Sequence, residues 1–209
     1  MTGLILKDLH VMKDSLKVYL FIFLIYGYLG IVEGQVGLMY AMVFITSVVL
    51  PVTSISYDER SRWDRLACTM PVSRKEIVYS KYLLSLILLL SSSAVVGIAL
   101  LAEDKMLVEE KVATGLIMVA LSLFYQAIMI PVILKTGSEK GRIILMGICF
   151  VPIIIMYILS RFEWFRAFDI EGFMLKWGSM LPYVAVAIVV VIYLVSIKTA
   201  VKIYTGKDL

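Results

Sequence analysis

Residues 82–102 read YLLSLILLLSSSAVVGIALLA and contain no charged side chain. A helix needs about 20 mostly apolar residues to cross the hydrocarbon core of a bilayer. In hydrocarbon each backbone N–H and C=O must be bonded within its own segment, so a run of this length predicts a helix rather than a barrel strand. The stretch therefore predicts an integral membrane protein of the all-α class.

The rest of the chain has the same character. Of its 209 residues 61% are hydrophobic, the mean hydropathy is +0.96, and the 17% that are charged gather in short clusters between long apolar runs. Such a chain needs the bilayer as its solvent. We expect a single transmembrane domain over residues 1–209 with six spanning helices, near residues 16–32, 36–56, 82–102, 112–134, 143–159 and 181–203. The first two spans are separated only by residues 33–35, so they should be antiparallel neighbours.

The basic residues predict the orientation. Most of the 20 Lys and Arg residues lie in the N-terminal segment, in residues 57–81, in residues 135–142 and near the C-terminus, which six spans place on one side. The positive-inside rule then puts both termini in the cytoplasm. The net charge of +4 is a topology signal, because no basic block is long enough to predict nucleic-acid binding.

Two amphipathic segments flank the spans. In residues 2–17 the apolar side chains Ile5, Leu9, Met12 and Leu16 recur at helical spacing, which predicts an interfacial helix on the inner leaflet. Residues 160–180 are rich in Phe and Trp but too interrupted by charge to span, so we expect short helices in the outer interface.

The loop at residues 57–81 reads YDERSRWDRLACTMPVSRKEIVYSK. Trp63, Leu66, Ala67 and Met70 follow the i, i+3, i+4, i+7 pattern of a short amphipathic helix, which Pro71 should end. Ser73 and Glu76 then form the S-x-x-E pattern of a capping box and should open the helix of the third span. A short helix joined in this way to two spans could act as a lever on both, or it could simply rest on the lipid headgroups.

Several function classes are excluded by what the sequence lacks. It has no G-x-x-x-x-G-K-[ST] motif, and no ionisable residue lies deep inside a predicted span, so neither a P-loop nor ion coupling is predicted to supply energy. The single histidine, His10, excludes H-E-x-x-H metalloproteases. Cys68 and Cys149 have no metal or disulfide spacing. We expect no catalytic residue, no metal site and no enzyme.

Polar residues inside the predicted spans are few. Ser92, in the Ser91–Ser93 run, is expected to permit close helix packing more than to touch a substrate, and Gln126 should seek a partner across a helix or dimer interface. These two residues are the candidates for a substrate path. Pro51, Pro131 and Pro152 lie inside or near the ends of predicted spans and are expected to kink their helices. The apolar interior favours an amphipathic or lipid-like substrate.

The start GLILKDLHVMK, the loop DERSRWDRLACTMPVSRKEIVYSKYL and the six-span plan together resemble the permease subunits of type-2 ATP-binding-cassette (ABC) exporters. The match departs from the family pattern at Met70, Trp63 and Cys68. Among these permeases the chain is most similar to the small ones of Gram-positive bacteria that export amphipathic, antimicrobial-type peptides, such as the phenol-soluble modulin exporter. The resemblance implies a location in the bacterial plasma membrane.

The resemblance also implies partners and roles. Residues 58–69 would form a coupling helix that docks in a groove of a separate cytosolic ATPase, with ATP and Mg²⁺ on that partner and no cofactor in this chain. Two permeases, identical or homologous, would pair within the membrane lipid. The residues expected to couple to the ATPase are Asp58, Glu59, Arg60, Arg62, Trp63, Arg65 and Leu66.

Two alternatives of other classes stay open. One is the membrane-embedded, vitamin-binding subunit of an uptake system, which has a similar length and span number. Such subunits typically carry a small-x-x-x-small pattern in the first span, whereas Gly27 and Gly30 are three residues apart. The other is a structural or sensory protein that partners a kinase.

Overall fold

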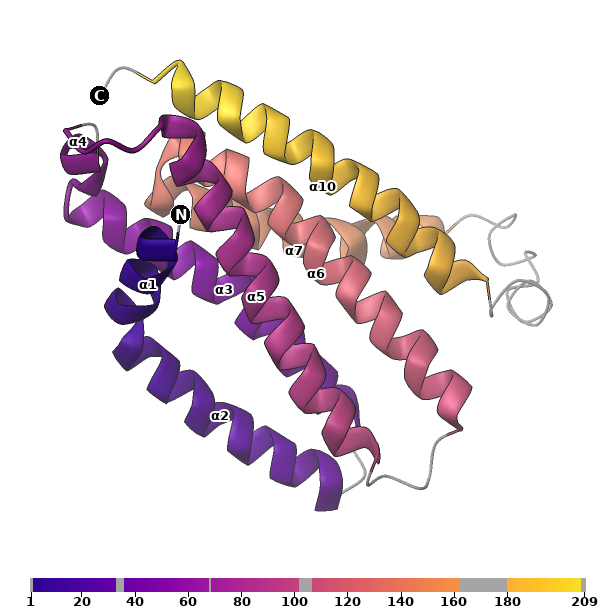
Figure 1. Cartoon of the computed structure of the whole chain (residues 1–209). Helices are drawn as coiled ribbons and strands as arrows, with labels where there is room; N and C mark the ends of the chain where they lie inside the picture. Colours follow the sequence, from indigo (N-terminus) through magenta and orange to yellow (C-terminus); the bar gives the residue numbers. More distant parts are fainter. Residues whose placement is uncertain (1, 33–35, 68, 102–106, 162–179, 208–209) are drawn as a thin grey trace.

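The computed structural model describes residues 2–32, 36–67, 69–101, 107–161 and 180–207, and every regular element in these ranges is a helix. The all-α class is therefore confirmed. The helices, labelled in Figure 1, are α1 (Thr2–Val11), α2 (Lys13–Val32), α3 (Val36–Arg60), α4 (Trp63–Ala67), α5 (Arg74–Leu101), α6 (Val108–Thr136), α7 (Ser138–Leu159) and α10 (Leu181–Thr205). The predicted turn at residues 33–35 and most of the aromatic segment at 160–180 lie outside the described residues.

Four helices in the described ranges are long and apolar enough to cross a membrane: Gly37–Arg60, Arg74–Leu100, Val108–Thr136 and Leu181–Thr205. They correspond to the second, third, fourth and sixth predicted spans. The first and fifth predicted spans are also helical, as α2 and α7, but they are not among these four. The structure thus establishes several apolar helices, and the number six stays a prediction.

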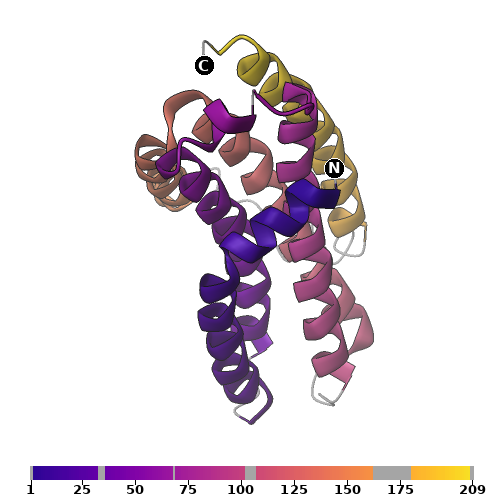
Figure 2. The same ribbon diagram turned by 60° about the vertical axis from the view of Figure 1, so that its left-hand side comes forward.

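Helices α3, α5 and α6 form the middle of the bundle, where α6 packs against α3, α5, α7 and α10. Figure 1 shows α10 along one side and α2 along the other, with α2 beside α3 as predicted for antiparallel neighbours. The main core joins the central helices through side chains that include Val78, Met129 and Ile130. The first and last described residues lie at the same end of the bundle as α4, and we call it the termini end (Figures 1 and 2).

The N-terminal helix differs from its prediction. α1 ends at Val11 and α2 begins at Lys13, so residues 2–17 are two helices with Met12 between them. Met12 is fully buried and packs with Leu50, Leu84 and Leu88, and Ile5, Leu9 and Leu16 pack against the same group. The apolar face that the sequence assigned to lipid therefore packs on α3 and α5, and only the opposite face, such as Leu6, is exposed.

Pro51 inside α3 and Pro131 inside α6 have specific consequences. A proline has no N–H for the carbonyl four residues earlier. Pro51 leaves the carbonyl of Ser47 without this donor, and the Gln126 amide of α6 donates to that oxygen at 3.0 Å. Pro131 leaves the carbonyl of Ala127, which accepts from the Ser196 hydroxyl of α10. Each orphaned carbonyl thus binds a side chain of a neighbouring helix, which is how prolines are tolerated in spanning helices.

Candidate coupling site

The end of α3, the short helix α4 and the start of α5 form one continuous corner at the termini end. The sequence analysis placed Asp58, Glu59 and Arg60 in the short coupling helix. In the structure α3 continues to Arg60, so these three residues belong to the last turn of α3. Arg62 turns the chain with a φ of 51°, and α4 covers only Trp63–Ala67. The predicted coupling helix of residues 58–69 is therefore wrong in its bounds, because the long helix extends further than the charged residues indicated.

The capping box that opens α5 is confirmed. The Glu76 carboxylate accepts from the Ser73 backbone N–H at 2.8 Å and from the Ser73 hydroxyl at 2.9 Å, and the Ser73 hydroxyl accepts from the Glu76 N–H at 3.2 Å. These bonds satisfy backbone donors at the helix start. The corner between α4 and α5 thus has a fixed geometry.

The faces of α4 are divided differently from the predicted stripe. Ala67 is buried and Trp63 is half-buried against the main core, as an amphipathic helix requires. Leu66 is 54% exposed and Met70 is 44% exposed. Arg62 and Arg65 are exposed as well. The outer surface of this corner therefore combines the apolar side chains of Leu66 and Met70 with the basic side chains of Arg62 and Arg65.

Beneath the corner lies a buried group of two lysines and two aspartates. The Lys81 ammonium donates to both oxygens of Asp8 at 2.8 Å, to the Ser54 hydroxyl at 2.9 Å, and to Asp58. Lys7 completes the group, at 2.6 Å from Asp58 and 2.9 Å from Asp8. Asp8, Asp58 and Lys81 are each less than 8% exposed. We call these four residues the ion-pair cluster.

The ion-pair cluster joins α1, α3 and α5 and also contacts α4. Asp8 and Lys7 come from α1, Asp58 from α3 and Lys81 from α5, two turns after its start. The Lys7 ammonium also lies 4.3 Å from the centre of the Trp63 ring, which is a cation–π distance. Charges with so little access to water persist only when they are paired and hydrogen-bonded. The cluster therefore fixes α1, α3 and α5 to one another next to α4.

Hydrogen bonds of Glu59 and Arg74 also tie this end of the bundle. The Glu59 carboxylate accepts from the Ser138 N–H at 2.6 Å, at the start of α7. Gly137 precedes it with a φ of 88°, and a Cβ there would lie 2.7 Å from a Glu59 oxygen, so glycine is required. Arg74 donates to the carbonyls of Thr205 and Lys207 at the end of α10. These bonds tie α3 to α7 and α5 to the end of α10.

The structure thus sorts the predicted coupling residues into two groups. Asp58 is buried in the ion-pair cluster, and Glu59 is bound to the start of α7. Arg60, Arg62, Arg65 and Leu66 are exposed, with Trp63 between the two groups. Contact of any of them with an ATPase stays a prediction. The sequence reading missed Asp8, Lys7 and Lys81. No local pattern marks Lys81 as a buried residue, because its partners Asp58 and Asp8 lie 23 and 73 residues earlier in the chain.

The two candidates for a substrate path, Gln126 and Ser92, both make hydrogen bonds to backbone carbonyls within the bundle. Gln126 is 1% exposed and binds the carbonyl of Ser47, so its amide has the cross-helix partner that the sequence predicted, within this chain. The Ser92 hydroxyl donates to the carbonyls of Leu88 and Leu89 in its own helix. Neither residue lines the cavity between α3, α5 and α6, which Ser93 borders. Their contact with a substrate stays untested.

No group of three or more His, Cys, Asp or Glu side chains in the described part of the chain is arranged to hold a metal ion. The arrangement at the termini end is one of helices joined by buried charges under an exposed, basic corner. Its geometry suits the transmission of a displacement.

Comparison with protein families gives a match over nearly the whole chain. The model of a family described as ABC-2 family transporter protein matches residues 3–205, which is nearly the whole chain. No curated protein matches the sequence significantly. The family match gives no support to the vitamin-binding alternative.

Proposed function

The chain belongs to the ABC-2 family of transporter proteins, and on this basis we propose that it is the permease subunit of an ABC exporter for an amphipathic or hydrophobic substrate such as a peptide. In this proposal six helices cross a bacterial plasma membrane and both termini lie in the cytoplasm. Two permeases, identical or homologous, pair to form the path. Membership of the family implies a cytosolic ATPase as partner, and that partner binds ATP and Mg²⁺.

The observation that carries the proposal is the structure of the termini end. α4 connects two of the four helices that are apolar enough to span, and it presents an exposed surface there. The ion-pair cluster lies directly behind it and fixes α1 to α3 and α5. A push on α4 would therefore move three helices together. This is the mechanical property that an ATPase-driven permease needs at its contact with the ATPase.

Within this surface the residues have different roles in the proposal. Leu66 is the apolar anchor, because more than half of its side chain is exposed on the outer face of α4. Arg62 and Arg65 flank it and favour an acidic groove on the ATPase. Trp63 instead holds α4 to α1, since its ring lies under the Lys7 ammonium. Asp58 acts behind the surface, and Glu59 ties the end of α3 to the start of α7.

The proposed substrate class rests on the bundle interior. Polar side chains such as Gln126, Ser92 and Ser196 are bonded to backbone carbonyls of the bundle itself. The remaining surfaces between helices are mainly apolar, so they suit a substrate with an apolar face.

The test is co-purification. The chain is expressed with the ATPase encoded beside it, solubilised in mild detergent and recovered by a tag on the permease. We expect the ATPase to be recovered with wild type and to be lost at least tenfold with Leu66→Glu and Arg65→Glu. Lys140→Glu is the matched control, because Lys140 is exposed at the start of α7, at the same end of the bundle.

The variants separate the roles. Trp63→Ala should weaken recovery less than Leu66→Glu, because it acts on α4 through its packing. Recovery of the ATPase with Leu66→Glu at the wild-type level would refute the coupling surface. Failure of wild type to recover any neighbouring ATPase would refute the transporter assignment itself.

A further inference from the structure

The face of α10 that points away from the bundle carries a continuous row of exposed side chains. Its members recur with a spacing of three or four residues: Val184, Ile188, Val191, Val195, Lys198 and Lys202. At 3.6 residues per turn they lie within an arc of about 80° on the helix. They are opposite Tyr193 and Ser196, which are buried against α5 and α6. We call these six residues the outer stripe.

The outer stripe changes from apolar to cationic along its length. Its first four residues are apolar and each is more than half exposed. From Val184 to Val195 the helix rises by about 16 Å, and the two lysines follow on the side of the termini end. On a helix that crosses a membrane, such a change marks the boundary between hydrocarbon and headgroups. Lys198 and Lys202 therefore lie at the headgroup level of the leaflet at the termini end.

The two lysines of the outer stripe have no counter-charge. Neither ammonium makes a hydrogen bond or an ion pair with a residue that the structure describes, and α10 contains no Asp or Glu. Of the helices that pack on α10, α6 carries its carboxylates at the opposite end, in its first turn. The other, α5, carries Glu76, whose carboxylate accepts from Ser73. Two unpaired positive charges therefore end the outer stripe.

Other cations at the termini end are held by partners within the chain. Lys17 of α2 lies 3.0 Å from Asp14, and Arg142 of α7 donates to the Ser56 hydroxyl at 3.2 Å. The lysines of the ion-pair cluster are bound to buried carboxylates. The outer stripe instead combines unpaired charge with a long apolar surface on the same helix face. An amphiphile with an anionic head complements both parts.

A second copy of this chain does not fit the outer stripe. Two copies with the same orientation in one membrane are related by an axis along the membrane normal. Pairing through this face would set the two α10 helices parallel and bring each lysine against its counterpart. Like charges brought together away from water repel strongly. A phospholipid of the bilayer instead supplies acyl chains for the apolar part and, if it is anionic, a phosphate for the lysines.

We propose that the outer stripe binds an anionic phospholipid of the leaflet at the termini end. An acyl chain lies along Val191 and Val195, and the phosphate lies between the ammonium groups of Lys198 and Lys202. The two lysines are about 6 Å apart along the helix axis, a distance that their long, flexible stems can bridge. The site goes beyond the proposed export function, because it requires neither the ATPase nor a transported substrate.

The test measures which lipid lies next to α10. In the full chain Trp63, Trp164 and Trp177 are replaced by Phe, and Val195→Trp adds one tryptophan on the outer stripe. This reporter protein is reconstituted in vesicles of dioleoyl phosphatidylglycerol and dioleoyl phosphatidylcholine, with brominated chains on one lipid or on the other. Bromine quenches only a nearby tryptophan, so the two series give the local ratio of the lipids. We expect phosphatidylglycerol to be favoured at least threefold.

Matched variants of the reporter protein test the cause. Lys198→Gln with Lys202→Gln should lower the preference to about one, whereas Lys198→Arg with Lys202→Arg should keep it. All of these side chains are exposed, so the fold should not change. Arg62→Gln with Arg65→Gln removes the same charge from the same end of the bundle and should leave the preference as it was. A second reporter, Val184→Trp at the far end of the stripe, should not respond to the lysine changes.

Native mass spectrometry repeats the test without any change of tryptophan. The otherwise unaltered chain, released from nanodiscs of the same two lipids, should retain one phosphatidylglycerol fewer with the two Lys→Gln changes than with the two Arg→Gln changes. Equal retention, or a reporter ratio near one before any lysine is changed, would overturn the site.

The alternative occupant is tested by cross-linking. With Cys68 and Cys149 replaced by Ser, Val191→Cys should form no disulfide between two copies in the membrane. Efficient disulfide formation would overturn the lipid site and would assign the outer stripe to the pairing of permeases. None of these results depends on recovery of an ATPase, so this proposal and the coupling proposal fail separately.

Discussion

Ser196 of α10 provides the sharpest test of how this bundle is held together. Its hydroxyl donates to the carbonyl of Ala127, which Pro131 leaves without an intrahelical donor, and it lies 2.7 Å from the hydroxyl of Tyr82. Ser196→Ala would leave both of these groups without this partner. Ala127 and Tyr82 are at most 4% exposed, so water would not replace the lost bonds.

The expected cost follows from these two bonds. An interhelical hydrogen bond in a membrane protein is worth about 0.6 kcal/mol on average and up to about 1.7 kcal/mol. Both partners of Ser196 are buried and one is a carbonyl freed by a proline, so a value above the average applies, about 1 kcal/mol for each bond. We expect Ser196→Ala to lower the free energy of unfolding by about 2 kcal/mol.

The proline supplies an internal check on the cause. With Pro131→Ala, residue 131 regains an N–H that can serve the carbonyl of Ala127. In that background Ser196→Ala loses only the bond to Tyr82, so its cost should fall to about 1 kcal/mol. The two substitutions should therefore be coupled by about 1 kcal/mol in a double-mutant cycle. Should Pro131→Ala perturb the fold, Tyr82→Phe tests the other half of the joint in the same way.

The assay is reversible unfolding in mixed micelles of mild detergent and dodecyl sulfate, followed by circular dichroism. Thr199→Ala is the control, because Thr199 is exposed on the same helix and its hydroxyl bonds only to the carbonyl of Val195. That control should stay within about 0.5 kcal/mol of wild type. A cost below that limit for Ser196→Ala, or no coupling to Pro131, would refute the reasoning.

Two further predictions concern the termini end. Lys81→Met leaves the buried carboxylates of Asp8 and Asp58 to share the single positive charge of Lys7 and should cost about 3 kcal/mol in the same assay, because removing one partner of a buried ion pair leaves a buried charge uncompensated. Adding Asp8→Asn restores one negative charge for the one positive charge of Lys7 and should recover much of that loss, and no recovery would show that the charge is not the cause. Ser73→Ala removes the cap that pairs with Glu76 and should cost about 1 kcal/mol, whereas Ser73→Asn, which can still cap, should be close to wild type; equal losses for both would contradict the capping role.

Local sequence patterns predicted the parts of the fold that depend on local physics. The apolar runs predicted the long helices, because an uncharged run of this length has no other stable form in a bilayer. The capping box at Ser73 predicted the start of α5 to within one residue, because its bonds span only three residues. The sequence marked Pro51 and Pro131 as kink positions and Gln126 as a residue that needs a cross-helix partner. It did not indicate that Ser196 binds the carbonyl that Pro131 leaves free.

The candidate site was predicted only in part, because its charges pair across long stretches of chain. Lys81 binds Asp8, 73 residues away, and the hydropathy of neither segment indicates that these charges are buried. The charged run after Tyr57 looks like a solvated loop, yet Asp58 and Glu59 extend α3 and point to partners on α1, α5 and α7. Burial of a charge depends on whether a counter-charge arrives in three dimensions, and a single sequence does not show that.

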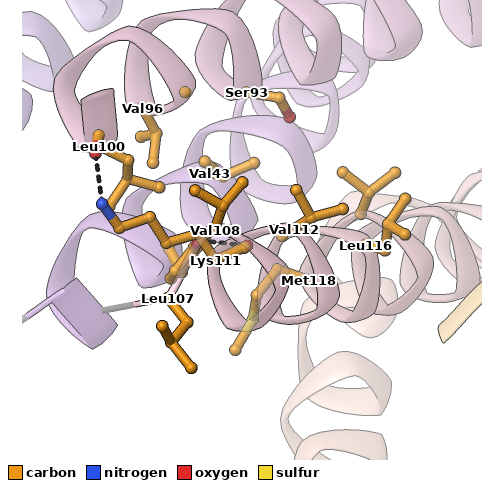
Figure 3. Close-up of a pocket in the computed structure, with 14 residues that line it drawn as sticks. Val43, Ser93, Val96, Leu100, Leu107, Val108, Lys111, Val112, Leu116 and Met118 are labelled. Carbon is orange, nitrogen blue, oxygen red and sulfur yellow. Dashed lines mark hydrogen bonds between the residues drawn. The ribbon is translucent and has the colours of Figure 1, made fainter. Parts of the chain in front are cut away.

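The distribution of polar bonds along the bundle gives the two ends different mechanical properties. At the termini end the ion-pair cluster, the Glu59 bond and the Arg74 bonds cross-link helices from α1 to α10. At the other end α3, α5 and α6 surround an apolar cavity, where Tyr40 donates to the carbonyl of Lys111 and Lys111 donates to the carbonyl of Leu100 (Figure 3). A displacement applied at α4 is therefore carried along α3 and α5 as a unit, and the deformation falls where the packing is loosest.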